Sequence, residues 1–224
     1  MSTLIINQQI VGIPAVCEEP AIDKTRFREK AIAGGKYILV VCLYGHFIER
    51  LRTRKEIEGY EQYLRSVADY AAKLNADNRL ACVILCGGHT KEGYISEAKS
   101  VFDHFFAIHW QNERSLLAKI ILEENSKNTA QNIRNALIIC LRQNIKGKLI
   151  VICDIVRRLK VSVLAGFLIN HFNKKENLKT EFELYTIKAF RRPDIHPHSR
   201  WWIQFLKALA YKFSPETIIK DLSK

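Results

Sequence analysis

The order of apolar runs and helical patterns constrains the fold of this chain more than any other feature of its sequence. Short, continuous apolar runs bounded by turn residues are typical of strands buried on both faces of a parallel sheet. Stretches with apolar residues at every third or fourth position predict helices. The two kinds alternate: strands are expected at 37–44, 80–86, 118–122, 149–153 and 181–187, and helices at 54–74, 96–106, 128–141, 156–172 and 201–213.

This alternation predicts an α/β fold, specifically a Rossmann-like three-layer sandwich. A helix that connects two parallel strands forms a right-handed crossover, and successive crossovers cover both faces of the sheet. We expect a mostly parallel sheet of about five strands. Around it, the sequence predicts an N-terminal arm over 1–35 with a short helix at 23–33, a Rossmann-like domain over 36–190, and a helical C-terminal cap over 191–224 packed on the same domain.

Length and composition favour one domain with a sizeable core, because the chain has 224 residues and 48% of them are apolar. No run approaches the ~18 apolar residues that a membrane span requires, and the N-terminus lacks a secretory signal pattern. We therefore expect a cytoplasmic protein without a membrane span. The six cysteines show no Cys-x-x-Cys spacing, which favours buried, reduced thiols and no metal.

The net charge of +12 favours attraction to phosphate-rich partners such as nucleotides, nucleic acid or anionic lipid. The basic residues are spread along the chain, however, as on the surface of an ordinary protein with many lysines. Nucleic acid is therefore not the expected partner. A non-enzymatic basic protein that binds nucleic acid or a membrane surface remains one of three hypotheses for the function.

Polar clusters follow three of the predicted strands, and the carboxyl ends of parallel strands form the edge where open α/β sheets bind ligands. The first cluster is Gly87-Gly88-His89-Thr90, followed by Ser96-Glu97 at the start of a helix. Glycines let the backbone approach a ligand, and His89 and Thr90 can donate to phosphate or ribose oxygens. An ordinary turn with Ser96 as a helix cap explains the same residues, and the common nucleotide fingerprints do not occur.

The second cluster lies between Glu123 and Asn132, where a predicted strand leads into a helix. Ser126, Asn128 and Thr129 can each cap the helix, but one cap is enough. Asn132 follows Asn128 by one helical turn, so both lie on one face. The cap leaves the other polar residues unexplained, and such a surface suits a ribose, an amide or a carboxylate. We therefore predict that Glu123, Ser126, Asn128, Thr129 and Asn132 contact a small-molecule ligand.

The third cluster begins at Asp154, directly after a strand, and continues with Arg157, Arg158 and Lys160 at the start of a helix. Cations are unfavourable at a helix N-terminus. Their presence indicates an anionic partner, which is a ligand phosphate or carboxylate or an acid such as Glu123, although a solvated basic turn explains them equally well. Arg157 and Arg158 are predicted ligand contacts. Asp154 and Glu97 are the acid/base candidates if the protein is an enzyme.

A segment near the C-terminus contains two histidines around a proline, His196-Pro197-His198, and is followed by Trp201-Trp202. The histidines could bind a metal or relay protons, but a third ligand at a recognisable spacing is missing, so no metal is expected. The tryptophans favour a loop anchored in the core, or a lid over the strand-end site.

Three blocks of the chain together resemble a large bacterial family of domains of unknown function that includes YdcF, SanA and ElyC. The blocks are Cys86-Gly87-Gly88 with Ser96-Glu97-Ala98, then Glu123-x-x-Ser126-x-Asn128-Thr129-x-x-Asn132, then Asp154 with basic residues after it, and they span roughly 37–172. The resemblance implies a Rossmann-like fold with its site at the strand ends. It also implies S-adenosylmethionine as a candidate ligand, since one member binds it, and a link to the cell envelope.

The chain departs from the family pattern at three places. Cys86 stands where serine is usual, Gln131 stands where glutamate is usual, and the block after the fourth strand often contains a histidine and an arginine that are not evident in 154–160. The leading hypothesis is a protein that binds a nucleotide-like small molecule, with S-adenosylmethionine among the candidates, and whether it is an enzyme stays open. The second hypothesis is a hydrolase or transferase for phosphorylated or glycan precursors of the cell envelope.

Overall fold

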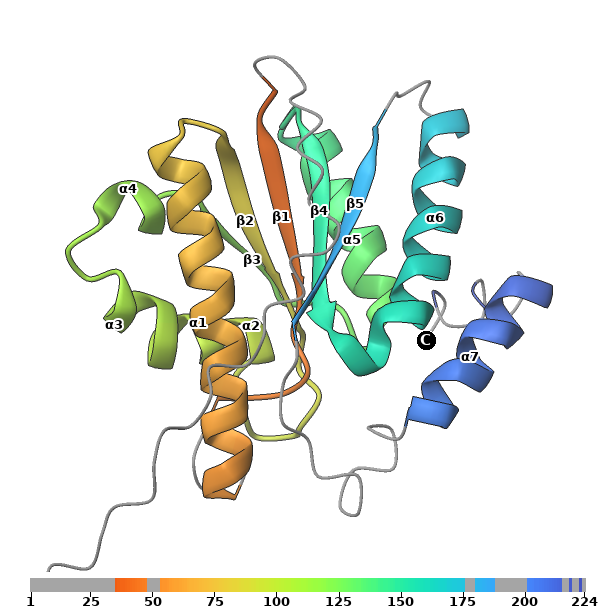
Figure 1. Cartoon of the computed structure of the whole chain (residues 1–224), viewed down its shortest axis with the longest axis horizontal. Coiled ribbons are helices and arrows are strands. Elements are labelled where there is room, and N and C mark those ends of the chain that lie inside the picture. The colour runs from red at the N-terminus through yellow and green to blue at the C-terminus, as the bar shows by residue number, and fades with distance from the viewer. Residues whose placement is uncertain are drawn as a thin grey trace, which may run out of the picture.

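The structure of this protein is a computed structural model that describes residues 35–47, 53–175, 180–187 and 201–214, together with Ile218 and Leu222. The predicted helix at 23–33 and the His196-Pro197-His198 segment lie outside the described residues. The predicted strand and helix alternation is present in the rest of the chain, and it builds an α/β sandwich (Figure 1).

The centre of the fold is a five-stranded sheet with the order β3-β2-β1-β4-β5, in which every neighbouring pair is parallel. Its strands are β1 (Tyr37–Cys42), β2 (Leu80–Cys86), β3 (Ile120–Glu123), β4 (Lys148–Asp154) and β5 (Phe182–Ile187). The chain moves outward from β1 to β3 and then returns to the other side of β1 for β4 and β5. The switch point of the topology therefore lies between β1 and β4, where such sheets bind their ligands.

Helices cover both faces of the sheet (Figure 1). One face carries α1 (Arg54–Ala76) and the segment between β2 and β3, which contains α2 (Glu97–Val101), α3 (Ala107–His109) and α4 (Arg114–Leu117). The other face carries α5 (Thr129–Arg142) and α6 (Arg158–Lys175), and α7 (Trp201–Phe213) packs on α6.

The side chains of β1 explain why it is central, because all six of its residues are buried. Leu39 and Val41 point into the core beneath α1, whereas Ile38, Val40 and Cys42 point into the core beneath α5 and α6. This continuous apolar run is what a strand covered on both faces requires.

The predicted helix at 96–106 is the element that differs most from expectation. The structure begins it with α2, continues it as a π-helical turn over Phe102–Phe106, and extends it past the predicted end through α3. The apolar residues in this segment keep a helical spacing through the wider turn, and for this reason periodicity did not reveal it. Phe105 and Phe106 are both buried against the core on this face.

Other boundaries shift by a few residues. β1 ends at Cys42 instead of 44, and β3 begins at Ile120 instead of 118. A short 3-10 turn over Ile155–Arg157 precedes α6, within the stretch predicted as the start of that helix. Among the described helices, none combines the length and the apolar character needed to cross a bilayer.

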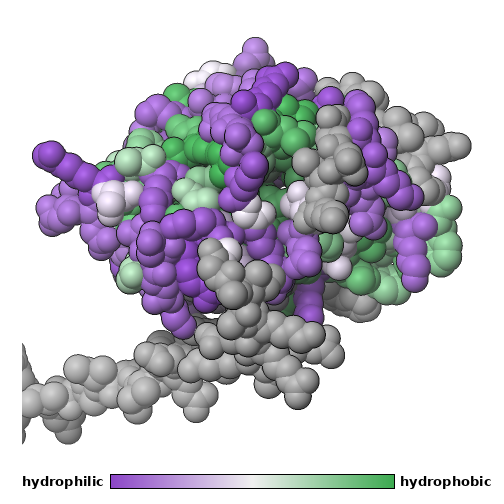
Figure 2. Space-filling view, turned by 90° about the horizontal axis from the view of Figure 1, so that it is seen from above, coloured by the Kyte–Doolittle hydropathy of each residue, from purple (hydrophilic) through white to green (hydrophobic). Residues whose placement is uncertain are grey.

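The two edges of the sheet have different surroundings. Figure 2 views the molecule from above, onto the amino ends of the strands, where hydrophilic surface borders apolar patches. A pocket of about 330 Å³ at this edge is lined by residues that include Ile38, Leu149 and Phe172. The carboxyl ends lie at the opposite edge, which carries the polar clusters predicted from the sequence.

Candidate functional site

The polar clusters lie on one rim of the sheet because each follows the carboxyl end of a parallel strand. Gly88 comes after β2, Ser126 after β3, and Asp154 ends β4. Two groups of charged side chains mark this rim. We call Glu97, Glu123 and Glu124, beside β2 and β3, the acidic cluster, and Arg157, Lys160 and Lys207, beside β1 and β4, the basic cluster.

Gly87 and Gly88 join the turn after β2 to its neighbours through backbone hydrogen bonds. The amide of Gly87 donates to Glu123 O at 3.0 Å, and that of Gly88 donates to Ser126 O at 2.9 Å. A Cβ atom on Gly88 would overlap the backbone oxygen of Ser126 and stand 2.8 Å from that of Glu124. Close packing of two loops therefore requires this glycine, whether or not a ligand binds.

The Glu123 carboxylate shapes the loop between β3 and α5. This buried side chain accepts hydrogen bonds from the Asn125 amide at 2.9 Å, from the Ser126 hydroxyl, and from Asn135 Nδ2 at 2.9 Å. Three donors occupy most of the accepting capacity of one carboxylate. Glu123 and Ser126 thus hold the loop in shape beneath the rim.

Glu97 and Glu124 are engaged through one oxygen each. Thr90 Oγ1 donates to Glu97 Oε1 at 2.5 Å, and Ser96 Oγ donates to Glu124 Oε1 at 2.5 Å. Ser96 also caps α2, because its hydroxyl accepts from the Lys99 amide at 2.9 Å. The second oxygens of the two carboxylates accept no hydrogen bond from the described residues, so each can receive a ligand hydroxyl.

The exposed residues of the turn after β2 contribute less to the rim network. His89 is exposed, and its Nδ1 lies 3.2 Å from Tyr94 O, while Thr90 is exposed and contacts Glu97. Both side chains are accessible from solvent at the acidic cluster, where they could touch a bound molecule.

The start of α5 contains both the expected cap and a contact to β1. Asn128 Oδ1 accepts from the Gln131 amide at 3.0 Å, and Gln131 Oε1 accepts from the Lys127 amide at 2.7 Å, so two backbone donors are satisfied at the helix start. Thr129 is buried in the first turn. The buried Asn132 side chain hydrogen-bonds the thiol of Cys42 at the end of β1.

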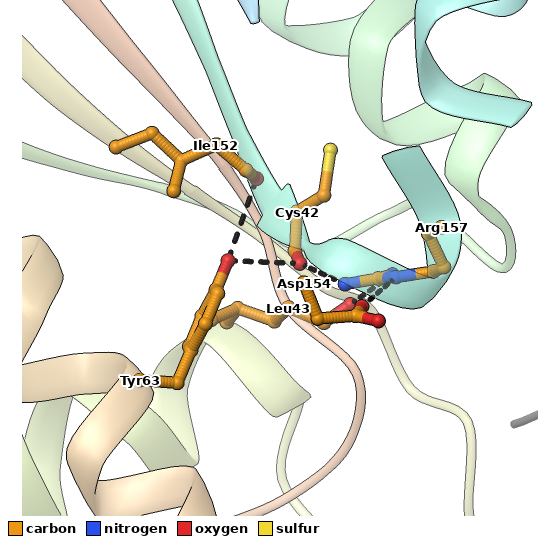
Figure 3. A network of polar contacts seen from close by, with 6 residues as sticks. All are labelled: Cys42, Leu43, Tyr63, Ile152, Asp154 and Arg157. Carbon is orange, nitrogen blue, oxygen red and sulfur yellow. Dashed lines mark hydrogen bonds and ion pairs between the residues drawn. The ribbon is translucent and has the colours of Figure 1, made fainter. Parts of the chain in front are cut away.

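Arg157 connects the ends of β1 and β4 at the switch point (Figure 3). Its Nη1 donates to Leu43 O at 3.0 Å, its Nη2 donates to Cys42 O at 2.5 Å, and its Nε donates to the carboxylate of Asp154. Burial alone would lower the pKa of Arg157, but Asp154 and the neighbouring polar groups raise it above its ordinary value, so the guanidinium stays charged. Arg158, by contrast, points to solvent.

Tyr63 adds a second contact to the same strand ends. Its hydroxyl lies 3.4 Å from Cys42 O and 3.4 Å from Ile152 O, and Figure 3 shows it reaching these carbonyls from α1. Most donors of Arg157 are engaged by β1 and Asp154. Arg157 and Asp154 therefore link the end of β4 to the end of β1, and we call this ion pair the clasp. A ligand bound at the switch point would contact the clasp.

Lys160 is the residue of the rim whose environment is least expected. It is only 8% exposed, and it makes no hydrogen bond or ion pair with any described residue. Burial, followed by the positive charges of Arg157 and Lys207, lowers the pKa of Lys160 to about 7, although Asp154 and Cys42 act in the opposite direction. An amine of this kind is a candidate for binding an anion or for chemistry.

Sequence reasoning counted Lys160 among the basic residues of this turn but assigned ligand contacts to Arg157 and Arg158. The available signal was its spacing, since Lys160 lies one helical turn beyond Arg157 and thus on the same face. The burial of Lys160 could not be read from the sequence, because Lys207 belongs to α7, which packs beside α6.

The buried thiols are not activated. Burial raises the pKa of Cys42 to about 11 and that of Cys86 well above its ordinary value, so both remain protonated at neutral pH. All five cysteines in the described part of the chain are free and buried. Within the same residues, His, Cys, Asp and Glu side chains form no group of three or more that could hold a metal ion.

No protein-family model matches the chain, and its comparison with curated proteins and with solved structures finds no match either. The resemblance to the YdcF-like family therefore stays a prediction, and the function has to be argued from the rim itself.

Proposed function

We propose that this protein binds a small anionic molecule of the nucleotide type at the rim between β1 and β4. The observation that carries the proposal is Lys160, a residue that is nine-tenths buried and whose amine has no partner among the described residues. An unpaired buried charge costs several kcal/mol, and an anion beside it removes most of that cost. A phosphate or carboxylate is the group that this environment favours.

The charge balance of the switch point supports an anion. Among the described residues, the charges near Lys160 are those of two further cations, Arg157 and Lys207, and of one carboxylate, Asp154. If all are ionised, the excess is two positive charges. The helices α5 and α6 also begin at this rim, after β3 and β4, and helix N-termini attract anions through their unpaired amides.

The acidic cluster supports a ligand with hydroxyl groups at its other end. Glu97 and Glu124 each have one carboxylate oxygen without a hydrogen bond from the described residues. They lie beside β2 and β3, and β2 is two strands from β4 in the sheet. Two strand spacings amount to ~10 Å, which a nucleoside phosphate can span with its ribose at the acidic cluster and its phosphate at the basic cluster.

This arrangement favours phosphorylated nucleotides over S-adenosylmethionine. The sulfonium and ammonium groups of S-adenosylmethionine would have to lie near the cations of the basic cluster, and like charges repel at this range. Its carboxylate remains a candidate for Lys160, and this keeps S-adenosylmethionine among the ligands to be tested.

The test is calorimetry with nucleoside mono-, di- and triphosphates, sugar nucleotides and S-adenosylmethionine. The wild type should bind at least one phosphorylated member, and Lys160→Met should weaken that binding about tenfold or more, since a charge-assisted contact contributes roughly 1.5–3 kcal/mol. Lys174→Met removes an exposed charge from the other end of α6 and should leave binding unchanged. Failure of the wild type to bind any of these compounds would overturn the proposal.

Turnover of the ligand is a second candidate function, as a hydrolase or transferase for phosphorylated precursors. It is favoured by Glu97, whose carboxylate is half engaged and lies next to the exposed Thr90. Asp154 suits this role less well because its carboxylate is buried in an ion pair with Arg157. Loss of turnover in Glu97→Gln, together with retained ligand binding, would support an enzyme.

A further inference from the structure

We propose that Lys160 is a nucleophilic amine that forms an imine with a ligand carrying both an anionic group and an aldehyde or ketone. The inference rests on the proposed function, because the ligand must occupy the same rim. It adds a covalent step and narrows the ligand class, since a carbonyl group is required in addition to the phosphate or carboxylate.

The first support is the contrast between Lys160 and two half-buried lysines whose amines have partners. Lys119 Nζ donates to Asn75 Oδ1 at 2.6 Å and to Leu80 O at 3.1 Å, and Lys148 Nζ pairs with Glu183 at 2.6 Å. These two lysines are half-buried and fully engaged. Lys160 is more buried than either, and no described residue accepts a hydrogen bond from its amine.

The second support is the set of groups around the amine. Cys42 from β1, Asp154 from β4, Arg157 from the 3-10 turn and Lys207 from α7 are the titratable neighbours. The Asp154 carboxylate is already paired with Arg157, and the thiol of Cys42 stays protonated because burial raises its pKa to about 11. The amine therefore faces two cations without an acid of its own.

Such surroundings favour the free amine, which is the reactive form. Burial and the adjacent cations lower the pKa of Lys160 to about 7, so about half of the molecules carry an unprotonated amine at neutral pH. An exposed lysine is unprotonated in roughly one molecule in a thousand or fewer. A lysine beside another cation in a water-poor site is a recurrent design for imine formation.

The anionic group of the ligand has its own receptor. Arg157 is engaged by Asp154 and by the carbonyls of Cys42 and Leu43. Lys207 is half-exposed, and it forms no ion pair within the described part of the chain. A ligand without a carbonyl group contacts both amines through its anion; in a ligand that carries a carbonyl group, we assign the anion to Lys207 and the carbonyl carbon to the amine of Lys160.

The chemistry needs no oxidant or further reactant. The lone pair of Lys160 Nζ attacks the carbonyl carbon while the carbon–oxygen π bond opens and the oxygen takes one hydrogen from the nitrogen. The hydroxyl group then leaves with the second hydrogen of the nitrogen as one molecule of water, and the carbon–nitrogen double bond forms. Addition of water reverses the sequence and releases the ligand.

The test uses pyridoxal 5'-phosphate as the probe, because it carries an aldehyde and a phosphate. The full chain is treated with the probe, the imine is reduced with borohydride, and labelled peptides are mapped by mass spectrometry. Lys160 should be labelled about tenfold faster than the exposed Lys174. The gain is smaller than the fraction of free amine suggests, because a less basic amine is also a weaker nucleophile.

Two further measurements test the contributions of the phosphate group of the probe and of Lys207. Pyridoxal, which lacks the phosphate, should need a higher concentration than pyridoxal 5'-phosphate for half-maximal labelling of Lys160, and Lys207→Met should likewise raise the concentration of pyridoxal 5'-phosphate that is needed, without abolishing the label. Labelling of Lys160 no faster than Lys174 in the wild type would overturn the inference, and this result does not depend on whether a variant folds.

The variant Lys160→Arg separates this inference from the proposed function. It keeps the positive charge but cannot form an imine, so it should bind phosphorylated nucleotides and lose the label at this position. Nucleotide binding by the wild type without selective labelling would remove the covalent step alone. Absence of nucleotide binding would remove the proposed function, whatever the labelling pattern.

Discussion

Asp154 and Arg157 form an ion pair in which both side chains are less than a tenth exposed, and the pair lies across the ends of β1 and β4. A buried guanidinium that also donates to the carbonyls of Cys42, the last residue of β1, and of Leu43 after it links the two strands at the switch point. Residues that stabilise the fold thus lie next to residues that we expect to bind the ligand. Substitutions at different residues of the rim can separate their effects on stability from their effects on binding.

Arg157→Met should destabilise the protein by ~3–5 kcal/mol, because it removes the guanidinium that pairs with the buried Asp154 carboxylate. Urea unfolding followed by circular dichroism measures this change. The matched control is Arg54→Met, which removes the exposed pair with Glu58 and should have a much smaller effect. The double variant Arg157→Met/Asp154→Leu should recover part of the lost stability. Equal stabilities for wild type and Arg157→Met would contradict the clasp.

Gly88→Ala should destabilise the protein by ~1–3 kcal/mol or more, since the new methyl group would meet the backbone oxygens of Ser126 and Glu124. Gly166→Ala is the control within α6. The nearest atom to a Cβ there is 4.0 Å away, and alanine favours a helix over glycine by ~0.5–1 kcal/mol, so this variant should be more stable than the wild type. Thermal unfolding of both variants checks the opposite signs.

The lowered pKa of Lys160 makes stability depend on pH in a defined direction. In the folded protein the amine releases its proton near pH 7, whereas in the unfolded chain it does so near pH ~10.4. Between these values the unfolded state binds more protons, so the free energy of unfolding should rise with pH. The rise from about pH 6 to about pH 8 should be ~1 kcal/mol.

The comparison with Lys160→Met isolates this contribution, because titration of the other groups is common to both proteins. The variant should lack the rise and should be more stable than the wild type at about pH 6. Anion binding should show the same titration with the opposite sign. Since the charged amine binds the anion, the affinity for sulfate, whose own charge does not change over this range, should fall roughly tenfold. A pH-independent difference between the two proteins would disprove the assignment.

Glu97→Gln should weaken binding of nucleotides with ribose hydroxyls by roughly fivefold to tenfold, as expected for the loss of one charge-assisted hydrogen bond. Binding of inorganic phosphate should not change, because phosphate reaches only the basic cluster. The exposed Glu92→Gln in the same connection is the charge-matched control. Calorimetry of the wild type and both variants with the two ligands gives six affinities, and an equal loss of nucleotide and phosphate binding in Glu97→Gln would exclude a local role of Glu97.

The sandwich was predictable because each strand is an unbroken apolar run and each crossover helix has a clear repeat. Tyr37–Cys42 and Leu80–Cys86 are examples of strands that are buried on both faces. The strand order was not predictable in the same way, because it depends on which face each crossover covers. The π-helical turn at Phe102–Phe106 escaped notice because its aromatic residues keep a helical spacing.

The candidate site was predictable at the level of the rim and much less so at the level of single residues. Strand ends had to converge in a parallel sheet, and this gave the location of Gly88, Ser126 and Asp154. The sequence could not reveal that Glu123 and Ser126 bond to each other, or that Arg157 is held by carbonyls of a strand more than a hundred positions away. The surroundings of Lys160 are formed by four separate elements of the fold. The sequence near Lys160 therefore does not indicate that its amine lacks a partner among the described residues.

The backbone hydrogen bonds of Gly88 determine how the rim would respond to a bound molecule. Its amide holds the loop after β3 through Ser126 O, and its carbonyl holds the first turn of α2 through the amide of Glu97. Gly88 thus connects the loop after β3 to the first turn of α2, so a displacement of one is passed to the other. A molecule that moves the loop beside α5 would therefore also move the first turn of α2, and the two segments beside the acidic cluster would respond to binding together.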